Sequence, residues 1–355
     1  MNKNQSLNPE GKLEKAPCGY AETIGVVGAG SWGTTLAHLL AEKGYQVDIW
    51  VYEPELVEII SQQHENTFYL PGHKISTNIY PSNSLEKVVT GKSLLVMAVP
   101  SHVYRDVAQK ALEYLRDKAT IVSVTKGIEN KTLLTMSGIW REILPPSKAI
   151  ELATLAGPSF AIEVIRKVPT AVTLASRDLE TARRLQRIFH TDYFRSYSST
   201  DEIGVELAGA IKNVIALAVG ICDGLCLGFN ARAALITRGL SEMSHLGVKM
   251  GADPLTFSGL SGLGDMALTC TGDLSRNRTV GLKLGQGKTL KSILKEMHMV
   301  PEGVKTTKSV YQLAQRENID MPICKNVYEI LYENKPCASV VKELMNRSLR
   351  DEMEL

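Results

Sequence analysis

The 355-residue sequence has almost no excess of charge of either sign. It contains 40 Lys and Arg residues against 38 Asp and Glu residues, which gives a formal net charge of +2. Proteins that coat nucleic acids or adhere to anionic membranes carry a clear basic surplus, so this balance argues against both functions and leaves room only for a local basic pocket. Charged residues make up 22% and hydrophobic residues 44% of the chain. This composition excludes wholesale disorder, and the length predicts about two domains.

Cysteine is sparse as well, and the six cysteines form no CxxC pair or Cys/His cluster of the kind that binds zinc. Cys222 and Cys226 could in principle share a metal ion. Their apolar surroundings favour buried thiols that act as small hydrophobic side chains, and we expect no metal site. Residues 1–20 are polar and contain no apolar run. We therefore expect a flexible tail, no signal peptide and a reducing, cytoplasmic location.

Short apolar runs alternate with amphipathic segments as far as about residue 200. We expect strands at residues 24–27, 46–51, 93–99, 120–124, 152–155 and 171–174, and helices at residues 34–43, 103–115 and 179–189. Alternation of this kind is typical of a mostly parallel sheet with helices on both faces. The sequence thus predicts an α/β N-terminal domain with a Rossmann-type doubly wound sheet over residues 21–200.

Strand patterns cease near residue 200, and long helical stretches follow, beginning with residues 203–221. We therefore predict an all-α C-terminal domain over residues 201–355. The stretch 203–221 is apolar enough to suggest a membrane span, but it contains Glu206, Lys212 and Asn213. Because ionisable groups are costly in the middle of a bilayer, a buried core helix is the favoured interpretation.

The glycine-rich segment GAGSWG at residues 28–33 has GxGxxG spacing between the first expected strand and the first expected helix. In that context it predicts a dinucleotide site. Gly28 would permit the tight turn, Gly30 would let the backbone approach a pyrophosphate, and Gly33 would allow close packing of helix on strand. Glu53 follows twenty residues after Gly33, where an acidic side chain can hold a ribose 2′-hydroxyl, and no arginine occurs in residues 47–58. The predicted cofactor is NAD or NADP, with a leaning towards NAD.

Lys212 lies in the apolar helical stretch AGAIKNVIALAVG. On a helix, Lys212 would lie beside Ala208, Gly209 and Ala216, at positions i−4, i−3 and i+4. All three are small enough to let a ligand reach the ammonium group. Burial lowers the pKa of a lysine, and a lysine nearer neutrality can exchange a proton with a substrate hydroxyl. The adjacent Asn213 offers a donor and an acceptor. The alternative, a lysine whose ammonium group extends to the surface, stays open at this point.

Three further segments carry polar groups that suit a phosphorylated ligand. Lys126 follows the expected strand 120–124, and the segment AGPSF at residues 156–160 follows the expected strand 152–155. Ligands of open parallel sheets bind at the carboxyl ends of the strands. Ser275, Arg276 and Asn277 supply hydroxyl, guanidinium and amide donors in series, a set suited to phosphate. Each segment alone is also compatible with an ordinary turn or a solvated surface.

Six segments in one order resemble the NAD(P)-dependent glycerol-3-phosphate dehydrogenases of bacterial type: GAGSWGTTLA, SVTKGIE, AGPSFAIEV, ELAGAIKNVIALAVGICDG, GLSGLGDMALTCTGDLSRNR and VPEGVKT. The resemblance extends over residues 23–321. Many bacterial members carry Arg or His at the end of the second strand, where this chain has Tyr52. The stretch WVYEPELVEIISQQHENTFYLPGHK is instead similar to the eukaryotic NAD-linked enzymes, which puts a preference for NADP in doubt.

The resemblance implies roles for the matching residues. Lys212 would be the proton donor and acceptor, acting with the other implied catalytic residues Lys126, Asp265 and Thr269. Besides Lys126, Lys212 and Asp265, the substrate would touch Gly157, Ser159 and Asn213, and its phosphate would be held by Ser275, Arg276 and Asn277. Cofactor contacts would come from Gly28, Gly30, Ser31, Trp32, Gly33, Tyr52, Lys126, Ala161, Arg276, Val300 and Glu302.

By resemblance, the chain would transfer hydride reversibly between NAD(P)H and dihydroxyacetone phosphate, giving sn-glycerol 3-phosphate for glycerophospholipid synthesis. It would act as a cytoplasmic homodimer, without nucleic acid and without membrane insertion. One alternative is another two-domain hydroxy-acid dehydrogenase, which would not need the cluster formed by Ser275, Arg276 and Asn277. A second is a non-catalytic dinucleotide sensor, which would not need Lys126, Lys212 and Asp265 together.

Overall fold

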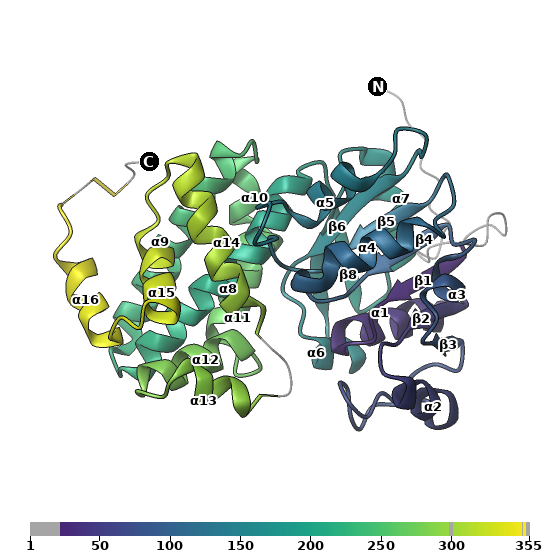
Figure 1. Ribbon diagram of the computed structural model, residues 1–355, viewed down its shortest axis with the longest axis horizontal. Helices are drawn as coiled ribbons and strands as arrows, with labels where there is room; N and C mark the ends of the chain where they lie inside the picture. The colour runs from purple at the N-terminus through teal and green to yellow at the C-terminus, as the bar shows by residue number, and fades with distance from the viewer. Residues whose placement is uncertain (1–21, 298–300, 350, 353–355) are drawn as a thin grey trace, which may run out of the picture.

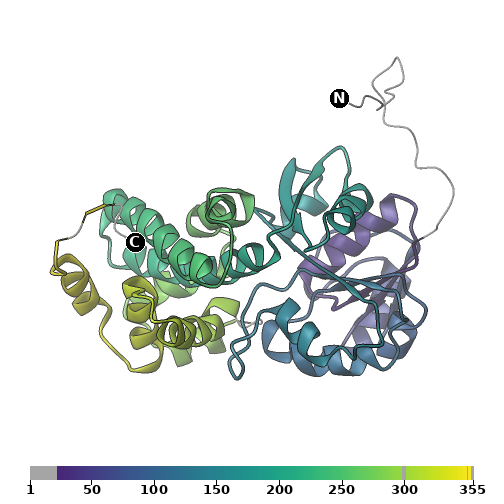
Figure 2. The same cartoon turned by 90° about the horizontal axis from the view of Figure 1, so that it is seen from above.

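The computed structural model of the chain describes residues 22–297, 301–349 and 351–352. A sheet covered by helices lies beside a purely helical part (Figures 1 and 2). The last strand of the sheet ends at Ser199, and the first helix of the helical part begins at Glu202. The predicted tail, residues 1–20, lies outside the described residues, and so does Val300.

The sheet has eight strands in the order β3-β2-β1-β4-β5-β6-β7-β8. Neighbouring strands are parallel except β6 and β7, which are antiparallel. The strands are β1 (Ile24–Val27), β2 (Val47–Trp50), β3 (Ile79–Ser82), β4 (Leu94–Met97), β5 (Thr120–Ser123), β6 (Glu151–Ala156), β7 (Thr170–Ala175) and β8 (Phe194–Ser199). Because β1 to β6 all run in one direction, their carboxyl ends meet at one edge of the sheet.

Helices cover both faces of the sheet, as expected for a doubly wound fold. One apolar core joins the sheet to α1 (Ser31–Glu42), α2 (Pro54–Gln63), α6 (Ala161–Ile165) and α7 (Leu179–Phe189). A separate core on the other face joins it to α3 (Leu85–Val89), α4 (Tyr104–Leu112) and α5 (Met136–Ile143). The predicted fold class, a Rossmann-type α/β sheet followed by a helical region, is confirmed.

Local differences from the expected elements have simple causes. Helix α1 begins at Ser31, inside the glycine-rich segment and three residues earlier than expected. The expected helix 103–115 is observed as α4 (Tyr104–Leu112), and a 3-10 turn, η1 (Ser101–Val103), leads into it. The sequence analysis did not anticipate β3, β8, or the helices α2, α3, α5 and α6. β3 is a four-residue edge strand that contains Pro81 and is only partly buried, so it lacks a clear strand pattern.

The helical part is built around α8 (Glu202–Gly224), in which residues 204–222 are all buried. Helix α8 is long and apolar enough to cross a membrane, but its apolar stretch is completely buried within the protein, which fits the core helix expected from the sequence. Around it lie α9 (Gly228–Lys249), α10 (Pro254–Ser258), η2 (Leu260–Gly264), α11 (Asp265–Thr271), α12 (Arg276–Gly285), α13 (Leu290–Lys295), α14 (Glu302–Glu317), α15 (Pro322–Tyr332) and α16 (Cys337–Met345).

Helices α8 and α12 are in backbone contact through glycines. A Cβ atom on Gly220 would lie 2.1 Å from the Arg278 carbonyl oxygen, and one on Gly281 would lie 2.1 Å from the Leu217 carbonyl oxygen. Only glycine permits such an approach. The contact holds the start of α12, and with it Arg276, close to the helix that carries Lys212.

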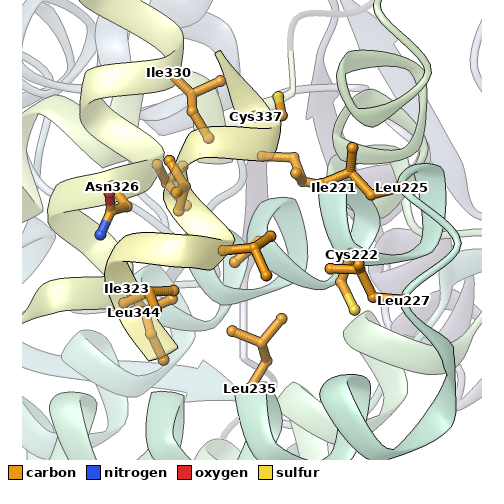
Figure 3. Close-up of a pocket in the computed structure, with 14 residues that line it drawn as sticks. Ile221, Cys222, Leu225, Leu227, Leu235, Ile323, Asn326, Ile330, Cys337 and Leu344 are labelled. Atoms are coloured by element: carbon orange, nitrogen blue, oxygen red, sulfur yellow. The ribbon is translucent and has the colours of Figure 1, made fainter. Parts of the chain in front are cut away.

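Helix α16 lies at the end of the molecule farthest from the sheet (Figure 1). With α8, α9 and α15 it encloses an apolar pocket that includes Cys222 and Asn326 but none of the predicted site residues (Figure 3).

The interpretation of Cys222 as a buried thiol is confirmed. It was wrong for Cys226, which is exposed, because this residue lies in the turn after α8 with a φ of +58°. No group of His, Cys, Asp and Glu side chains that could hold a metal ion occurs among the described residues.

Candidate active site

The glycine-rich loop connects β1 to α1 in a conformation that depends on its glycines. Gly28 has a φ of +113°, and a Cβ atom there would lie 2.9 Å from the Ala98 backbone. A Cβ atom on Gly33 would lie 2.0 Å from the Gly28 carbonyl oxygen, whereas one on Gly30 would meet no atom within 4 Å. Helix α1 begins at Ser31, so its amino-terminal N–H groups open towards the space beside Gly30. This arrangement fits the pyrophosphate of a dinucleotide.

Other predicted cofactor residues lie around the same loop. The Trp32 ring packs 6.5 Å from the Phe194 ring, and its buried indole N–H has no hydrogen-bond partner among the described residues. Ala161 begins α6 beside α1, since its carbonyl oxygen accepts a hydrogen bond from the Thr35 hydroxyl. Tyr52 follows β2 and is 77% exposed. These positions are compatible with a bound dinucleotide, while the individual contacts stay predictions.

Two lysines from different parts of the chain share one buried carboxylate. Lys212 of α8 donates to Asp265 Oδ1 (2.6 Å) and to the Thr269 hydroxyl (2.6 Å). Lys126, after β5, donates to Asp265 Oδ2 (2.6 Å) and to the Gly157 carbonyl oxygen (3.3 Å). The structure therefore brings together Lys126, Lys212, Asp265 and Thr269, four residues that span 144 positions, from 126 to 269.

This cluster lies where the carboxyl edge of the sheet meets α8 and α11. Lys126 and Gly157 follow the parallel neighbours β5 and β6, whereas Lys212 and Asp265 belong to the helical part. Gly209, one of the small neighbours expected beside Lys212, lies next to the second lysine: a Cβ atom there would be in ordinary van der Waals contact with Lys126 Cγ, at 3.5 Å. Ser159 also faces this edge and donates to the Gly157 carbonyl oxygen (3.0 Å).

Lys212 is buried, which answers the question that the sequence left open. Burial lowers the pKa of its ammonium group to about 8, because desolvation disfavours the charged form. The Asp265 carboxylate acts in the opposite direction, and the positive charge of Lys126 lowers the pKa of Lys212 further. The Thr269 hydroxyl accepts a second hydrogen bond from the ammonium group. A lysine held in this way can change protonation state near neutral pH.

The predicted phosphate-binding residues lie at the start of α12. The hydroxyl of Ser275, its N-cap, accepts from the Arg278 N–H (3.3 Å). Asn277 donates to Asn213 Oδ1 (2.9 Å) and accepts from the Gly303 N–H (3.0 Å). The side-chain amides of these two asparagines, both predicted to bind substrate, therefore connect α8, α12 and α14. Arg276 is exposed, although the surrounding protein lowers the pKa of its guanidinium group by desolvation. Of this cluster, Arg276 is the residue that presents a large polar side chain to solvent.

The structure adds residues that the sequence analysis missed. The N–H and hydroxyl of Ser101, after β4, both donate to the carboxylate of Glu302 at the start of α14. Ser101 thus links the sheet to the helical part through Glu302, which is itself a predicted cofactor residue. Asn66 and Tyr69 lie against the glycine-rich loop and Glu53. The position of Ser101 just after a strand could have indicated its place, whereas no local signal indicated Asn66 or Tyr69.

The comparisons with known proteins agree with this geometry. The family model of the NAD-dependent glycerol-3-phosphate dehydrogenase N-terminus matches residues 23–182, and the model of the C-terminus matches residues 201–342. A glycerol-3-phosphate dehydrogenase [NAD(P)+] of Syntrophobacter fumaroxidans is 60% identical over 94% of this chain and 98% of the relative. One of Citrifermentans bemidjiense is 55% identical over 94% and 99%, respectively.

A solved structure shows the same architecture. The crystal structure of glycerol-3-phosphate dehydrogenase from Coxiella burnetii superposes with a TM-score of 0.87 at 39% identity, covering 92% of this chain and 99% of that one. The two family models together match most of the chain, and they include both the glycine-rich loop and the lysine cluster. The chain therefore belongs to the NAD-dependent glycerol-3-phosphate dehydrogenase family.

Proposed function

We propose that this chain catalyses reversible hydride transfer between NAD(P)H and dihydroxyacetone phosphate, giving sn-glycerol 3-phosphate. The observation that carries this proposal is the pair of lysines on Asp265, at the sheet edge to which the dinucleotide loop also belongs. A hydroxy-acid dehydrogenase does not account for the donors at the start of α12, and a dinucleotide sensor does not account for the lysine pair. The family match favours the same reaction over both alternatives.

The bound nicotinamide supplies the hydride in reduction and accepts it in oxidation. The protein's own task is to manage the proton and the charge on the substrate oxygen. In reduction, the ammonium group of Lys212 donates a proton to the carbonyl oxygen as that oxygen gains electrons. In oxidation, the neutral amine accepts the proton of the hydroxyl group. Its pKa of about 8 keeps both forms accessible near neutral pH.

Asp265 and Lys126 prepare the site for this proton transfer. The carboxylate holds both ammonium groups in place through its two oxygens, at 2.6 Å each. Lys126 is less buried, with 20% of its side chain exposed. It places a second positive charge near the oxygen on which negative charge develops. Electrostatic stabilisation by groups already in position lowers the barrier without reorganisation of the site.

Arg276 would bind the phosphate of the substrate away from the reacting carbon. It stands at the first position of α12, where the helix N-terminus also favours an anion. Ser275 and Asn277 are buried and fix this turn through their hydrogen bonds. Binding energy from a remote phosphate orients the ketone carbon, which raises kcat as well as lowering KM.

Further properties of this enzyme are proposals that rest on its family resemblance. We propose a homodimer in the cytoplasm that supplies sn-glycerol 3-phosphate for glycerophospholipid synthesis. Light scattering of the purified protein would give twice the mass of one chain for the dimer. Deletion of the gene would create a requirement for glycerol or glycerol 3-phosphate if the product serves lipid synthesis. We also propose a preference for NAD, because Glu53 follows β2 and residues 47–58 contain no arginine.

The test is an assay of NADH and NADPH oxidation with dihydroxyacetone phosphate as substrate, for the wild type and Lys212→Ala. Loss of the general acid is expected to lower kcat by about 10²- to 10⁴-fold. The Kd for NADH is expected to change by no more than about twofold, since the glycine-rich loop is untouched. Lys249→Ala, at the exposed end of α9, is the matched control. Turnover of the Lys212→Ala variant at the wild-type rate would refute the assignment.

A further inference from the structure

A segment outside the glycine-rich loop is fastened to it by one buried side chain. Asn66 is completely buried, and its Nδ2 donates to the Ala29 carbonyl oxygen (2.8 Å) and to the Thr34 hydroxyl (2.8 Å). Its Oδ1 accepts from the backbone N–H of Tyr69 (3.0 Å). The backbone of Tyr69 is therefore held at a set position relative to the loop in which Ala29 lies between Gly28 and Gly30.

The side chain of Tyr69 extends from this anchor to Glu53. Its hydroxyl donates to Glu53 Oε1 at 2.6 Å, a short hydrogen bond to a carboxylate. Glu53 is the N-cap of α2, but its side chain makes no capping hydrogen bond. Its carboxylate is thus held by Tyr69 and not by its own helix. Among the described residues, no hydrogen-bond donor to the second oxygen, Oε2, is present.

Glu53 also lies close to the start of the glycine-rich loop along the backbone. The N–H of Gly28 donates to the carbonyl oxygen of Trp50 (3.2 Å), three residues before Glu53. β1 and β2 are parallel neighbours, so the loop and Glu53 leave the sheet at the same edge. In dinucleotide-binding sheets an acidic side chain at this position meets the adenosine ribose.

We infer that Tyr69 is a positioning residue for cofactor selectivity, which orients the Glu53 carboxylate towards the ribose and so favours a 2′-hydroxyl over a 2′-phosphate. The inference rests on the proposed NAD preference and names a residue that controls it. A carboxylate held through one oxygen keeps the other for the ribose hydroxyl, and its charge repels a phosphate. Without the Tyr69 hydroxyl, the Glu53 side chain gains rotamers in which neither effect operates.

The test measures cofactor binding by the full chain, without turnover. Kd values for NADH and NADPH are determined from nicotinamide fluorescence for the wild type, Tyr69→Phe, Glu53→Gln and the double variant. Tyr80→Phe is the matched control, since Tyr80 is a 46% exposed tyrosine on β3 without a hydrogen bond to its hydroxyl among the described residues. Thermal unfolding without cofactor separates a change of selectivity from a loss of stability.

We expect Tyr69→Phe to reduce the preference for NADH over NADPH by about fivefold to tenfold, mainly through weaker NADH binding. In the Glu53→Gln background the same substitution should change the ratio by less than about twofold, because Tyr69 acts through the carboxylate. The inference is overturned if the wild type prefers NADH and Tyr69→Phe keeps that preference, or if the two substitutions are additive. A wild type that binds NADPH as tightly as NADH refutes the NAD preference itself, and with it this role of Tyr69, but not the dehydrogenase activity.

Discussion

Replacement of Asp265 by asparagine would test whether this carboxylate controls the protonation of Lys212. In the wild type the pKa of Lys212 is about 8, as the sum of burial and Lys126, which lower it, and Asp265, which raises it. The amide of asparagine keeps a similar shape but has no charge. An opposite charge within hydrogen-bond distance raises the pKa of an amine by about one to three units, or ~1.4–4 kcal/mol. Asp265→Asn should therefore lower the pKa of Lys212 by about this amount.

The direction of the effect differs between the two reactions. Oxidation of sn-glycerol 3-phosphate needs the neutral amine, so kcat/KM rises with pH through the pKa of Lys212. Reduction of dihydroxyacetone phosphate needs the ammonium form, so kcat/KM falls through the same pKa as the pH rises. In the wild type both midpoints should lie near pH 8. In Asp265→Asn both should move to lower pH, so that reduction near pH 7 loses more activity than oxidation does.

The assay follows the formation or consumption of NADH by its absorbance. It is run from about pH 5.5 to 10 in a buffer of constant ionic strength, because salt screens charge interactions. Thr269→Val provides the control, because it removes a neutral hydrogen bond to Lys212 Nζ and should move the midpoint much less than the loss of a charge. Circular dichroism establishes that each variant is folded. A midpoint in Asp265→Asn that stays at the wild-type pH or moves upwards would refute the account of Lys212 as the titrating group.

The remaining predictions concern the substrate phosphate and the cofactor loop. Arg276→Ala should raise KM for dihydroxyacetone phosphate by about tenfold or more, since a hydrogen bond to a charged group contributes ~1.5–3 kcal/mol; initial-rate kinetics decide this, and an unchanged KM would contradict the phosphate role. Gly33→Ala should lower the melting temperature because its Cβ would lie 2.0 Å from the Gly28 carbonyl oxygen. Gly30→Ala should leave the melting temperature unchanged and weaken NADH binding, because its Cβ enters open space beside the α1 N-terminus; an unchanged Kd for NADH in Gly30→Ala would contradict the assignment of this space to the cofactor.

Local patterns located much of the fold and part of the site. β1 was expected at its observed bounds, and so was α7, since continuous apolar runs and amphipathic spacing are local properties. Edge strand β3 was missed, because a short, half-exposed strand with Pro81 has no such pattern. Lys212 was identified from the conflict between a charged side chain and its apolar helix. The glycine-rich loop was identified from its spacing between a strand and a helix.

The sequence alone indicates the fold class, the dinucleotide loop and the candidate lysines. Each is inferred from local patterns, in which residues close together in the sequence form a strand, a helix or a loop. The partners of these residues depend on the tertiary structure. Asp265 lies 53 positions after Lys212 and 139 after Lys126, and only the packing of the sheet edge on α8 and α11 joins all three. The same holds for Tyr69, whose proposed role rests on a hydrogen bond to Glu53, a residue on the other side of α2 in the sequence. A pKa near 8 follows from burial and from these neighbours, and neither is a local property of the chain.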